Sequence, residues 1–286
     1  MTSTTTDTHR LRRGEGATPP SAAAREAAAP APRRRLRVPT AALLRWLSPL
    51  ALLVLWQVAS DTGVLSPKDL AAPSTILAAA RDRIDNGQLP DALAVSLRRA
   101  ALGLVVGVSA ATVLGAIAGL SRTGDVVVDP PMQMLRTLPL FGLIPLFILW
   151  FGIGETPKVL LVALGVVVPL YLNLVAALRG IDPELYEVAD SLRLTRRERV
   201  RHILLPGALP GALVGLRQSL GVAWLALVVA EQVNAGSGLG YMINNARDFL
   251  QTDVVVVGLL TYAVLGLVTD ALVRVLERRA LRWRTA

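Results

Sequence analysis

Long apolar runs without a charged residue alternate along this chain with short polar or charged stretches. Two of these runs, residues 100–120 and 159–178, each match the length of about 20 apolar residues that a helix needs to cross a bilayer core of about 30 Å. Helices in soluble cores are rarely apolar on every side over such a length. The pattern therefore predicts an all-α polytopic membrane protein.

Six membrane crossings fit the apolar runs of the whole chain. The third contains Pro139 and Pro145 and is expected to be kinked, and the pair Pro130–Pro131 is expected to stop any helix before it. Glycines at spacings of four or multiples of four in the second crossing predict close packing against another helix. The predicted crossings are residues 41–59, 97–120, 134–151, 158–178, 211–230 and 254–269, with 276 as the farthest limit of the last.

A polar stretch, residues 60–99, separates the first two crossings. It contains an amphipathic pattern that predicts a surface helix beginning at Pro73 and ending at Asn86–Gly87. This helix is expected on the outer face of the membrane. The arginines of the stretch would then lie outside, which the length of the loop and its accompanying aspartates allow.

Residues 179–210 form the one strongly charged, helix-patterned insert between apolar runs. Asp182 is a suitable N-cap for a short helix that begins at Pro183, and a turn at 193–195 leads into a second helix that Pro206 stops. Arginines of this density cannot lie in lipid. Composition alone leaves two interpretations open: a helical hairpin that docks on another protein, and a basic loop held at lipid headgroups.

The formal charge of the chain is +9, and its arginines cluster beside the apolar runs. Six crossings place the N-terminal tail, the turn at Arg122, the 179–210 loop and the C-terminus on one side. The positive-inside rule makes that side the cytoplasm and explains the charge better than nucleic-acid binding does. Residues 1–40 cannot bury a core and are expected to be a disordered, basic cytoplasmic tail. A cleaved signal peptide is the alternative interpretation of this end.

Residue types that catalysis or metal binding would need are missing from the predicted crossings. The chain has no cysteine, which excludes disulfides and thiol chemistry, and its two histidines, His9 and His202, lie outside the crossings. No carboxylates cluster within the crossings either. We therefore expect no enzymatic activity, no metal and no cofactor in this chain.

Four polar residues inside the crossings are candidates for a substrate pathway, because polar groups within a membrane are expected to be functional by default. Arg217 is the strongest candidate for an anionic substrate, although it lies close enough to a helix end to snorkel or to pair there. Asn173, Gln218 and Ser219 are the others, and a hydrogen bond between helices explains each of them as well.

The 179–210 loop carries a spaced motif, in which Glu187-Val188-Ala189 is followed by Arg193 and then by Ile203-Leu204-Leu205-Pro206. This spacing resembles the EAA loop of binding-protein-dependent ABC importer permeases, in which E-A-A precedes a glycine and then I-x-L-P. Two positions depart from that pattern. Val188 replaces an alanine, and Arg193 replaces the glycine, which strains any turn that needs a positive φ there.

By this resemblance, the loop couples the chain to a separate ATPase. The implied coupling residues are Glu187, Ala189, Arg193, Leu205 and Pro206. Glu187 would form charge-assisted hydrogen bonds with basic groups of the ATPase, and Ala189 would permit close packing.

Other motifs extend the resemblance to residues 50–284 and toward the permeases for aliphatic sulfonates. The broader family includes permeases for taurine, nitrate and pyrimidine precursors. The motifs outside the EAA pattern are Gln133–Arg136, Ile144–Leu146, Ile148–Ile153, Leu205–Pro210 and Gln251–Val257.

The resemblance implies a type I ABC importer permease of the MetI-like fold, with residues 41–286 as its transmembrane domain. Such a permease is a homodimer in the bacterial plasma (inner) membrane. It docks a cytoplasmic ABC ATPase dimer and receives substrate from a periplasmic or lipid-anchored substrate-binding protein. It holds no nucleotide, in agreement with the lack of a G-x-x-x-x-G-K-[ST] loop in the sequence.

The implied activity is import of aliphatic sulfonates by alternating access. Import of taurine, nitrate or a pyrimidine precursor by the same machinery is one alternative. A stand-alone secondary transporter or channel is another, but it would need no docking loop. The glycine-rich run 236–240 follows a crossing rather than a strand, so it is expected to be a flexible outer turn that touches the binding protein and not a phosphate cradle.

Overall fold

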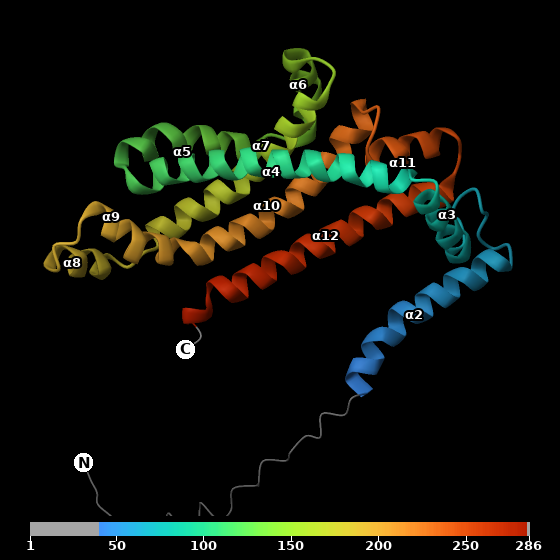
Figure 1. Cartoon of the computed structure of the whole chain (residues 1–286), viewed down its shortest axis with the longest axis horizontal. Coiled ribbons are helices and arrows are strands. Elements are labelled where there is room, and N and C mark those ends of the chain that lie inside the picture. Colours follow the sequence, from blue (N-terminus) through green and yellow to red (C-terminus); the bar gives the residue numbers. More distant parts are fainter. Residues whose placement is uncertain (1–39, 285–286) are drawn as a thin grey trace, which may run out of the picture. The chain divides into compact units, whose positions relative to one another are not determined.

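Residues 40–284 are described by the computed structural model, and within them the side chains from Leu47 to Trp283 except that of Asn234. Figure 1 shows this range as helices joined by turns, with no strand among the described residues. The expected tail over residues 1–40 falls almost wholly outside them. The helices are α2 (Thr40–Asp61), α3 (Pro73–Asp85), α4 (Gln88–Leu120), α5 (Arg122–Thr137), η1 (Leu140–Leu143), α6 (Ile144–Phe151), α7 (Glu155–Arg179), α8 (Pro183–Ser191), α9 (Arg196–Arg199), η2 (Val200–Leu204), α10 (Leu205–Asn234), α11 (Leu239–Asp248), α12 (Thr252–Ala280) and η3 (Arg282–Arg284).

Four stretches of helix in this range are long and apolar enough to cross a membrane. A fifth crossing arises if α5 and the η1–α6 segment form one broken span, whose two parts meet at 98°. The predicted first crossing lies in α2, whose described side chains, Leu47–Asp61, form an apolar helix shorter than a full crossing. The four full-length stretches are Gln88–Leu120, Glu155–Arg179, Arg196–Val233 and Thr252–Ala280.

Helix α4 begins nine residues earlier than the second predicted crossing, at Gln88 instead of position 97. Gly87 adopts a left-handed φ of +81° between α3 and α4, and the Asn86 side chain accepts a hydrogen bond from the Gln88 backbone N–H at 3.0 Å. Helix α3 has the predicted bounds at this turn. The early start places Ser96 and Arg99 inside a helix rather than in a surface stretch.

Helix α5 corrects the expectation that Pro130–Pro131 stops any helix, because it continues through both prolines to Thr137. The prolines lack the N–H groups that would reach the carbonyls of Val126 and Val127. Both valines are exposed, so those carbonyls lie on an open side of the helix. The other side is held against α4 and α7, where the Tyr171 hydroxyl donates to Asp129 at 2.9 Å.

The predicted kink of the third crossing occurs after α5. Leu138 is extended, with ψ of 134°, as expected of the residue before Pro139. Pro145 does not contribute to the bend. It lies in the first turn of α6, where its missing N–H would have no partner in any case.

From Leu52 onward the chain forms one compact unit, centred on α4, α7 and α10. A Cβ atom added to Gly103 or Gly107 of α4 would lie 2.5 Å from Val162 Cγ1 or 2.6 Å from Val166 Cβ of α7. The glycine spacing therefore serves close helix packing, as predicted. A Cβ atom added to Gly119 would contact Leu178, so the C-terminal ends of α4 and α7 lie together. Because α7 leads into α8 there, we call this the α8 end.

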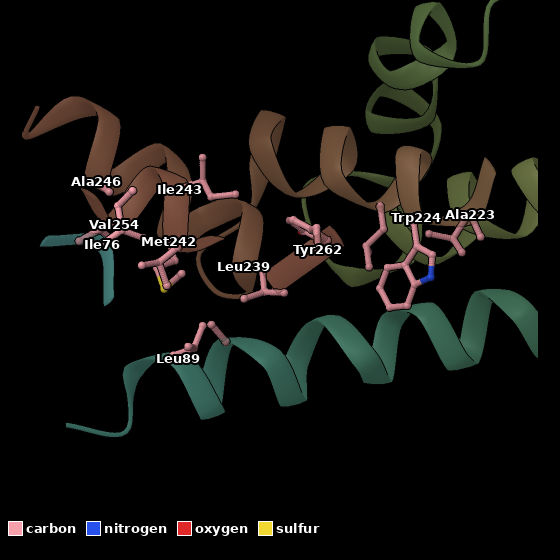
Figure 2. Packing of buried hydrophobic residues seen from close by; sticks show 14 of the residues in the cluster. Ile76, Leu89, Ala223, Trp224, Leu239, Met242, Ile243, Ala246, Val254 and Tyr262 are labelled. Carbon is pink, nitrogen blue, oxygen red and sulfur yellow. The ribbon is translucent and has the colours of Figure 1, made fainter. Parts of the chain in front are cut away.

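The opposite end, which we call the α11 end, is closed by a hydrophobic cluster shared by α3, α4, α7, α10, α11 and α12. Figure 2 shows Leu239 and Met242 of α11 on the side that faces α4 and Leu89, whereas Ile243 lies on the other side of α11. A Cβ atom added to Gly258 of α12 would lie 2.4 Å from Ile243 Cγ1, so Ile243 packs against α12. This packing positions the turn between α10 and α11 against the first turns of α4.

Candidate functional site

The first half of the 179–210 loop is helix α8, capped as predicted. The Asp182 carboxylate accepts a hydrogen bond from the Glu184 backbone N–H at 2.9 Å. Glu187 and Val188 are exposed, whereas Ala189 is 0% exposed. Ala189 therefore packs inside the chain's own loop and leaves the outer face of α8 to acidic and apolar side chains.

Arg193 ends α8 in a left-handed conformation, with φ of +51°. The Leu194 N–H donates to the Ala189 carbonyl at 2.9 Å, and the Arg193 N–H donates to the Asp190 carbonyl at 3.0 Å. These two bonds define a Schellman motif, in which glycine is the usual residue at this position. The turn thus needs the positive φ that the motif predicted, and it adopts that φ with an arginine.

The second half of the loop differs from the prediction. Thr195 and Glu198 form a capping box, with the Thr195 N–H donating to Glu198 Oε2 at 2.8 Å, and α9 follows. Pro206 does not stop the helix: a π-turn, η2, carries it directly into α10. The wider turn relieves the clash between a proline ring and the carbonyl four residues before it.

As a result, the loop and the membrane helix are one continuous rod, Arg196–Val233. Arg199 ties this rod back to α8, because its guanidinium pairs with Asp190 and also donates to the Leu194 carbonyl at 3.3 Å. Leu205 is exposed at the junction and Pro206 is half-buried. The loop is therefore braced on both sides of the Arg193 turn.

Two of the four predicted pathway residues lie together. Asn173 Nδ2 donates to Gln218 Oε1 at 2.9 Å and to the Pro169 carbonyl at 2.8 Å. Both side chains line a cavity of about 330 Å³ between α7, α10 and the break after α5, which we call the α5-break pocket. Its remaining lining consists of Leu135, Arg136, Leu138, Leu140, Leu143, Leu164, Gly165, Val168, Pro169, Leu172 and Val222.

The other two candidates lie elsewhere. Arg217 Nε donates to Asp270 at 2.7 Å, and Arg274 pairs with the same carboxylate at 2.5 Å, so Arg217 joins α10 to α12. Ser219 is buried and donates to the Val166 carbonyl of α7 at 2.8 Å. The geometry thus gives Arg217 an ion pair and Ser219 a hydrogen bond between helices.

A buried polar cluster at the α11 end was not foreseen from the sequence. Arg99 is 1% exposed and donates to Glu231 at 2.6 Å and, through two nitrogens, to Glu155 at 2.6 Å. Glu231 is 0% exposed and also accepts from Ser96 at 2.8 Å and from Tyr262 at 2.8 Å. The sequence held one indication of this cluster, because Arg99 and Glu231 have opposite charges and lie at the ends of two predicted crossings on the same side of the membrane.

The glycine-rich run 236–240 surrounds this cluster. The Ser237 carbonyl accepts from Arg99 at 2.8 Å, and the Gly240 N–H donates to Glu231 at 2.9 Å. A Cβ atom on Gly238, whose φ is +103°, would lie 2.6 Å from an Arg99 nitrogen. The run is therefore a tight cover over a buried ion pair, which corrects the expectation of a loose outer turn.

Comparison with known proteins agrees with this architecture. Residues 104–282 match the family described as "binding-protein-dependent transport system inner membrane component". A crystal structure described as an amino acid ABC transporter with histidines superposes with a TM-score of 0.56 at 20% identity, covering 66% of this chain and 92% of that one. This likeness extends the agreement to the fold.

Sequence relatives cover most of the chain. Proteins named as aliphatic sulfonates transport permease SsuC are 44% identical in Bacillus subtilis and 45% identical in Escherichia coli. Each match covers 84% of this chain, with 87% of the first protein and 92% of the second. The taurine transport system permease TauC of Escherichia coli is 35% identical over 81% of this chain and 86% of its own length. The chain is therefore a multi-pass membrane permease of the binding-protein-dependent ABC transporter family, with the all-α MetI-like fold.

Proposed function

We propose that this chain is the permease subunit of an ATP-driven importer of aliphatic sulfonates. Substrate class is supported by the two SsuC relatives, which share 44% and 45% of residues over 84% of this chain. The chain translocates the substrate by alternating access and leaves ATP hydrolysis to a separate subunit of the transporter. Residues 41–286 form the permease domain, with the 179–210 loop as its coupling element.

The observation that carries the coupling proposal is the rigid connection of α8 to α10. Glu187 and the apolar residues Leu185, Val188 and Leu192 are exposed on α8, so they are free to contact a partner. The Arg193 turn and the Asp190–Arg199 pair fix α8 to the rod that begins at Arg196. A force on α8 is then passed to a membrane helix without a flexible hinge.

The proposed assembly is a homodimer of this chain with an ABC ATPase dimer and a substrate-binding protein. The turn after α4 and the 179–210 loop lie at the same end, since Arg179 pairs with Asp125. We assign this end, together with both termini, to the cytoplasm, because it carries the arginine-rich segments. We expect the exposed arginines of that end that form no ion pair within the described residues, such as Arg196 and Arg197, to contact lipid phosphates.

Coupling is tested by the charge reversal Glu187→Lys in the assembled transporter, reconstituted in proteoliposomes. We expect ATP hydrolysis stimulated by the loaded binding protein to fall at least tenfold, since a charge-assisted contact contributes about 1.5–3 kcal/mol. Asp248→Lys is the matched control, because Asp248 is an exposed carboxylate on α11. Normal stimulated hydrolysis in Glu187→Lys would show that α8 is not the docking surface.

Substrate class is tested by growth of a deletion strain on ethanesulfonate, taurine or nitrate as the sole source of sulfur or nitrogen. Loss of growth on ethanesulfonate alone supports the proposal. Loss on taurine alone would transfer the assignment to the taurine branch, which the 35% identity to TauC makes the second candidate.

A further inference from the structure

The α5-break pocket has the composition of a site for an amphiphilic anion. Its volume of about 330 Å³ lies within the range of small-molecule sites, and most of its lining is aliphatic. Three polar side chains, those of Arg136, Asn173 and Gln218, interrupt that lining. An apolar cavity with a few convergent polar groups and one cation suits an anionic head joined to a short alkyl chain.

The side chain of Arg136 has no hydrogen bond or ion pair to any residue that the structure describes, and it is exposed at the end of α5. Three other arginines of the spans are paired: Arg99 with Glu155 and Glu231, Arg179 with Asp125, and Arg217 with Asp270. An arginine in a membrane-spanning segment faces a water-filled path or a partner charge. Arg136 lies next to the break of the span, so its five donors are available to a ligand.

The amide of Gln218 is oriented by its neighbour. The Pro169 carbonyl only accepts, so the Asn173 atom that contacts it at 2.8 Å must be the amide nitrogen. That nitrogen also donates to Gln218, whose contacting atom must then be its oxygen. The Gln218 nitrogen is consequently directed away from Asn173, and no described residue accepts from it. It is a second donor for an anion in the same pocket.

The geometry points to a substrate site within the permease itself: we infer that Arg136 and Gln218 bind the sulfonate group of the transported anion. The aliphatic lining, which includes Leu140, Leu172 and Val222, then takes the alkyl chain. This inference rests on the proposed function and assigns the cation of the pathway to Arg136 instead of Arg217. The planar guanidinium matches the oxygens of a sulfonate as it matches those of a carboxylate or phosphate.

The test uses the full transporter in proteoliposomes and measures uptake of radiolabelled butanesulfonate. Arg136→Gln is expected to lower uptake about 10- to 100-fold, the loss typical of a hydrogen-bonded charge, and Arg136→Lys to retain an intermediate rate. Copurification of the ATPase with each variant reports assembly, so that a loss of uptake is distinguished from a loss of the complex. Arg122→Gln is the matched control, because Arg122 is exposed at the other end of α5 and lines none of the pocket.

A second variant probes the apolar part. Val222→Phe fills the cavity beside Gly165 and should reduce uptake of butanesulfonate about tenfold more than that of methanesulfonate, since the longer chain needs the space. An equal effect on both substrates, or normal uptake by Arg136→Gln, would overturn the inference.

The same chemistry would also recognise a lipid phosphate. If the defect of Arg136→Gln disappears in vesicles of purely zwitterionic lipid, Arg136 binds anionic headgroups and the inference is wrong. A persistent defect there supports it. Failure of the wild-type transporter to import any alkanesulfonate would instead refute the proposed function, a result that the Arg136 variants cannot produce.

Discussion

Replacing Glu231 by alanine removes the carboxylate that holds the α11 end together. The side chain is 0% exposed and accepts hydrogen bonds from Arg99, Ser96, Tyr262 and the Gly240 backbone. Its removal leaves donors buried without an acceptor and takes one of the two carboxylates away from a buried guanidinium. The cost comes mainly from these stranded groups, because a satisfied buried ion pair adds little net stability.

The expected loss is about 3–5 kcal/mol, the range for breaking a buried pair by removing one partner. At about 2–4 °C per kcal/mol for a chain of this size, the midpoint of thermal unfolding should fall by roughly 6–20 °C. The matched control is Asp248→Ala, which removes the acid of the Arg247–Asp248 pair. Both side chains of that pair are 67% exposed, so the expected loss is about 0–1 kcal/mol.

The assay heats detergent-solubilised protein in steps and measures the monodisperse fraction by size-exclusion chromatography. A double variant, Arg99→Met with Glu231→Leu, should recover part of the loss, since it removes the buried guanidinium that Glu231→Ala leaves short of a carboxylate. Glu155 is 47% exposed and keeps Lys158 at 3.5 Å, whereas Ser96 and Tyr262 still lack their acceptor. The reasoning is refuted if Glu231→Ala shifts the midpoint no more than Asp248→Ala does. It is also refuted if the unfolding midpoint of the double variant lies below that of Glu231→Ala.

Three further predictions concern other sites. Arg193→Gly should raise the unfolding midpoint by a few degrees, because glycine adopts positive φ at a cost about 1 kcal/mol lower; a lower midpoint would argue against strain at this turn. Gly107→Val should destabilise the α4–α7 contact by about 1–3 kcal/mol in the same assay, whereas Gly221→Ala, which meets no atom within 4 Å, should not. Arg217→Gln should lower stability by about 0–1 kcal/mol and leave the substrate concentration for half-maximal uptake unchanged; a large rise in that concentration would return Arg217 to the pathway.

Local features of the fold were predictable because each depends on a few neighbouring residues. The bounds of α3 follow from Pro73 and from Asn86–Gly87, and the start of α8 follows from Asp182. The strain at Arg193 was also predictable, since the motif spacing marks the position at which the chain turns. Apolar length alone was sufficient to place the four full crossings.

Features that depend on contacts between distant segments were not predictable. Arg99 and Glu231 lie 132 positions apart, and a pattern read along the chain treats each as a surface charge beside a crossing. The glycine-rich run looked like a flexible turn in the sequence, but its glycines are needed because a Cβ atom on Gly238 or Gly240 would clash with Arg99 or Glu231. The prolines of α5 and Pro206 misled for a related reason: whether a proline stops a helix depends on how the neighbouring carbonyls are accommodated.

The same limit applied to the candidate pathway. Polarity within a crossing identified Asn173 and Gln218, which do line one pocket, but also Ser219, whose hydroxyl bonds to α7. Arg136 was not among the candidates, although it lies near the start of the predicted third crossing, residues 134–151. Only the packing of α5 beside α7 brings it to the amides.

If α8 docks an ATPase as proposed, the length of the rod from Arg196 to Val233 sets how far a movement at α8 is amplified. Arg196 and Gln218 belong to the same rod, and the 22 positions between them correspond to about 33 Å at 1.5 Å per residue. A tilt of about 5° relative to α7, pivoting at the loop, would displace Gln218 by about 3 Å. This displacement equals the donor–acceptor distance of 2.9 Å between Asn173 and Gln218, so it would break their hydrogen bond. Under the proposed coupling, a rotation of α8 by a few degrees would therefore be large enough to separate Gln218 from Asn173 in the α5-break pocket.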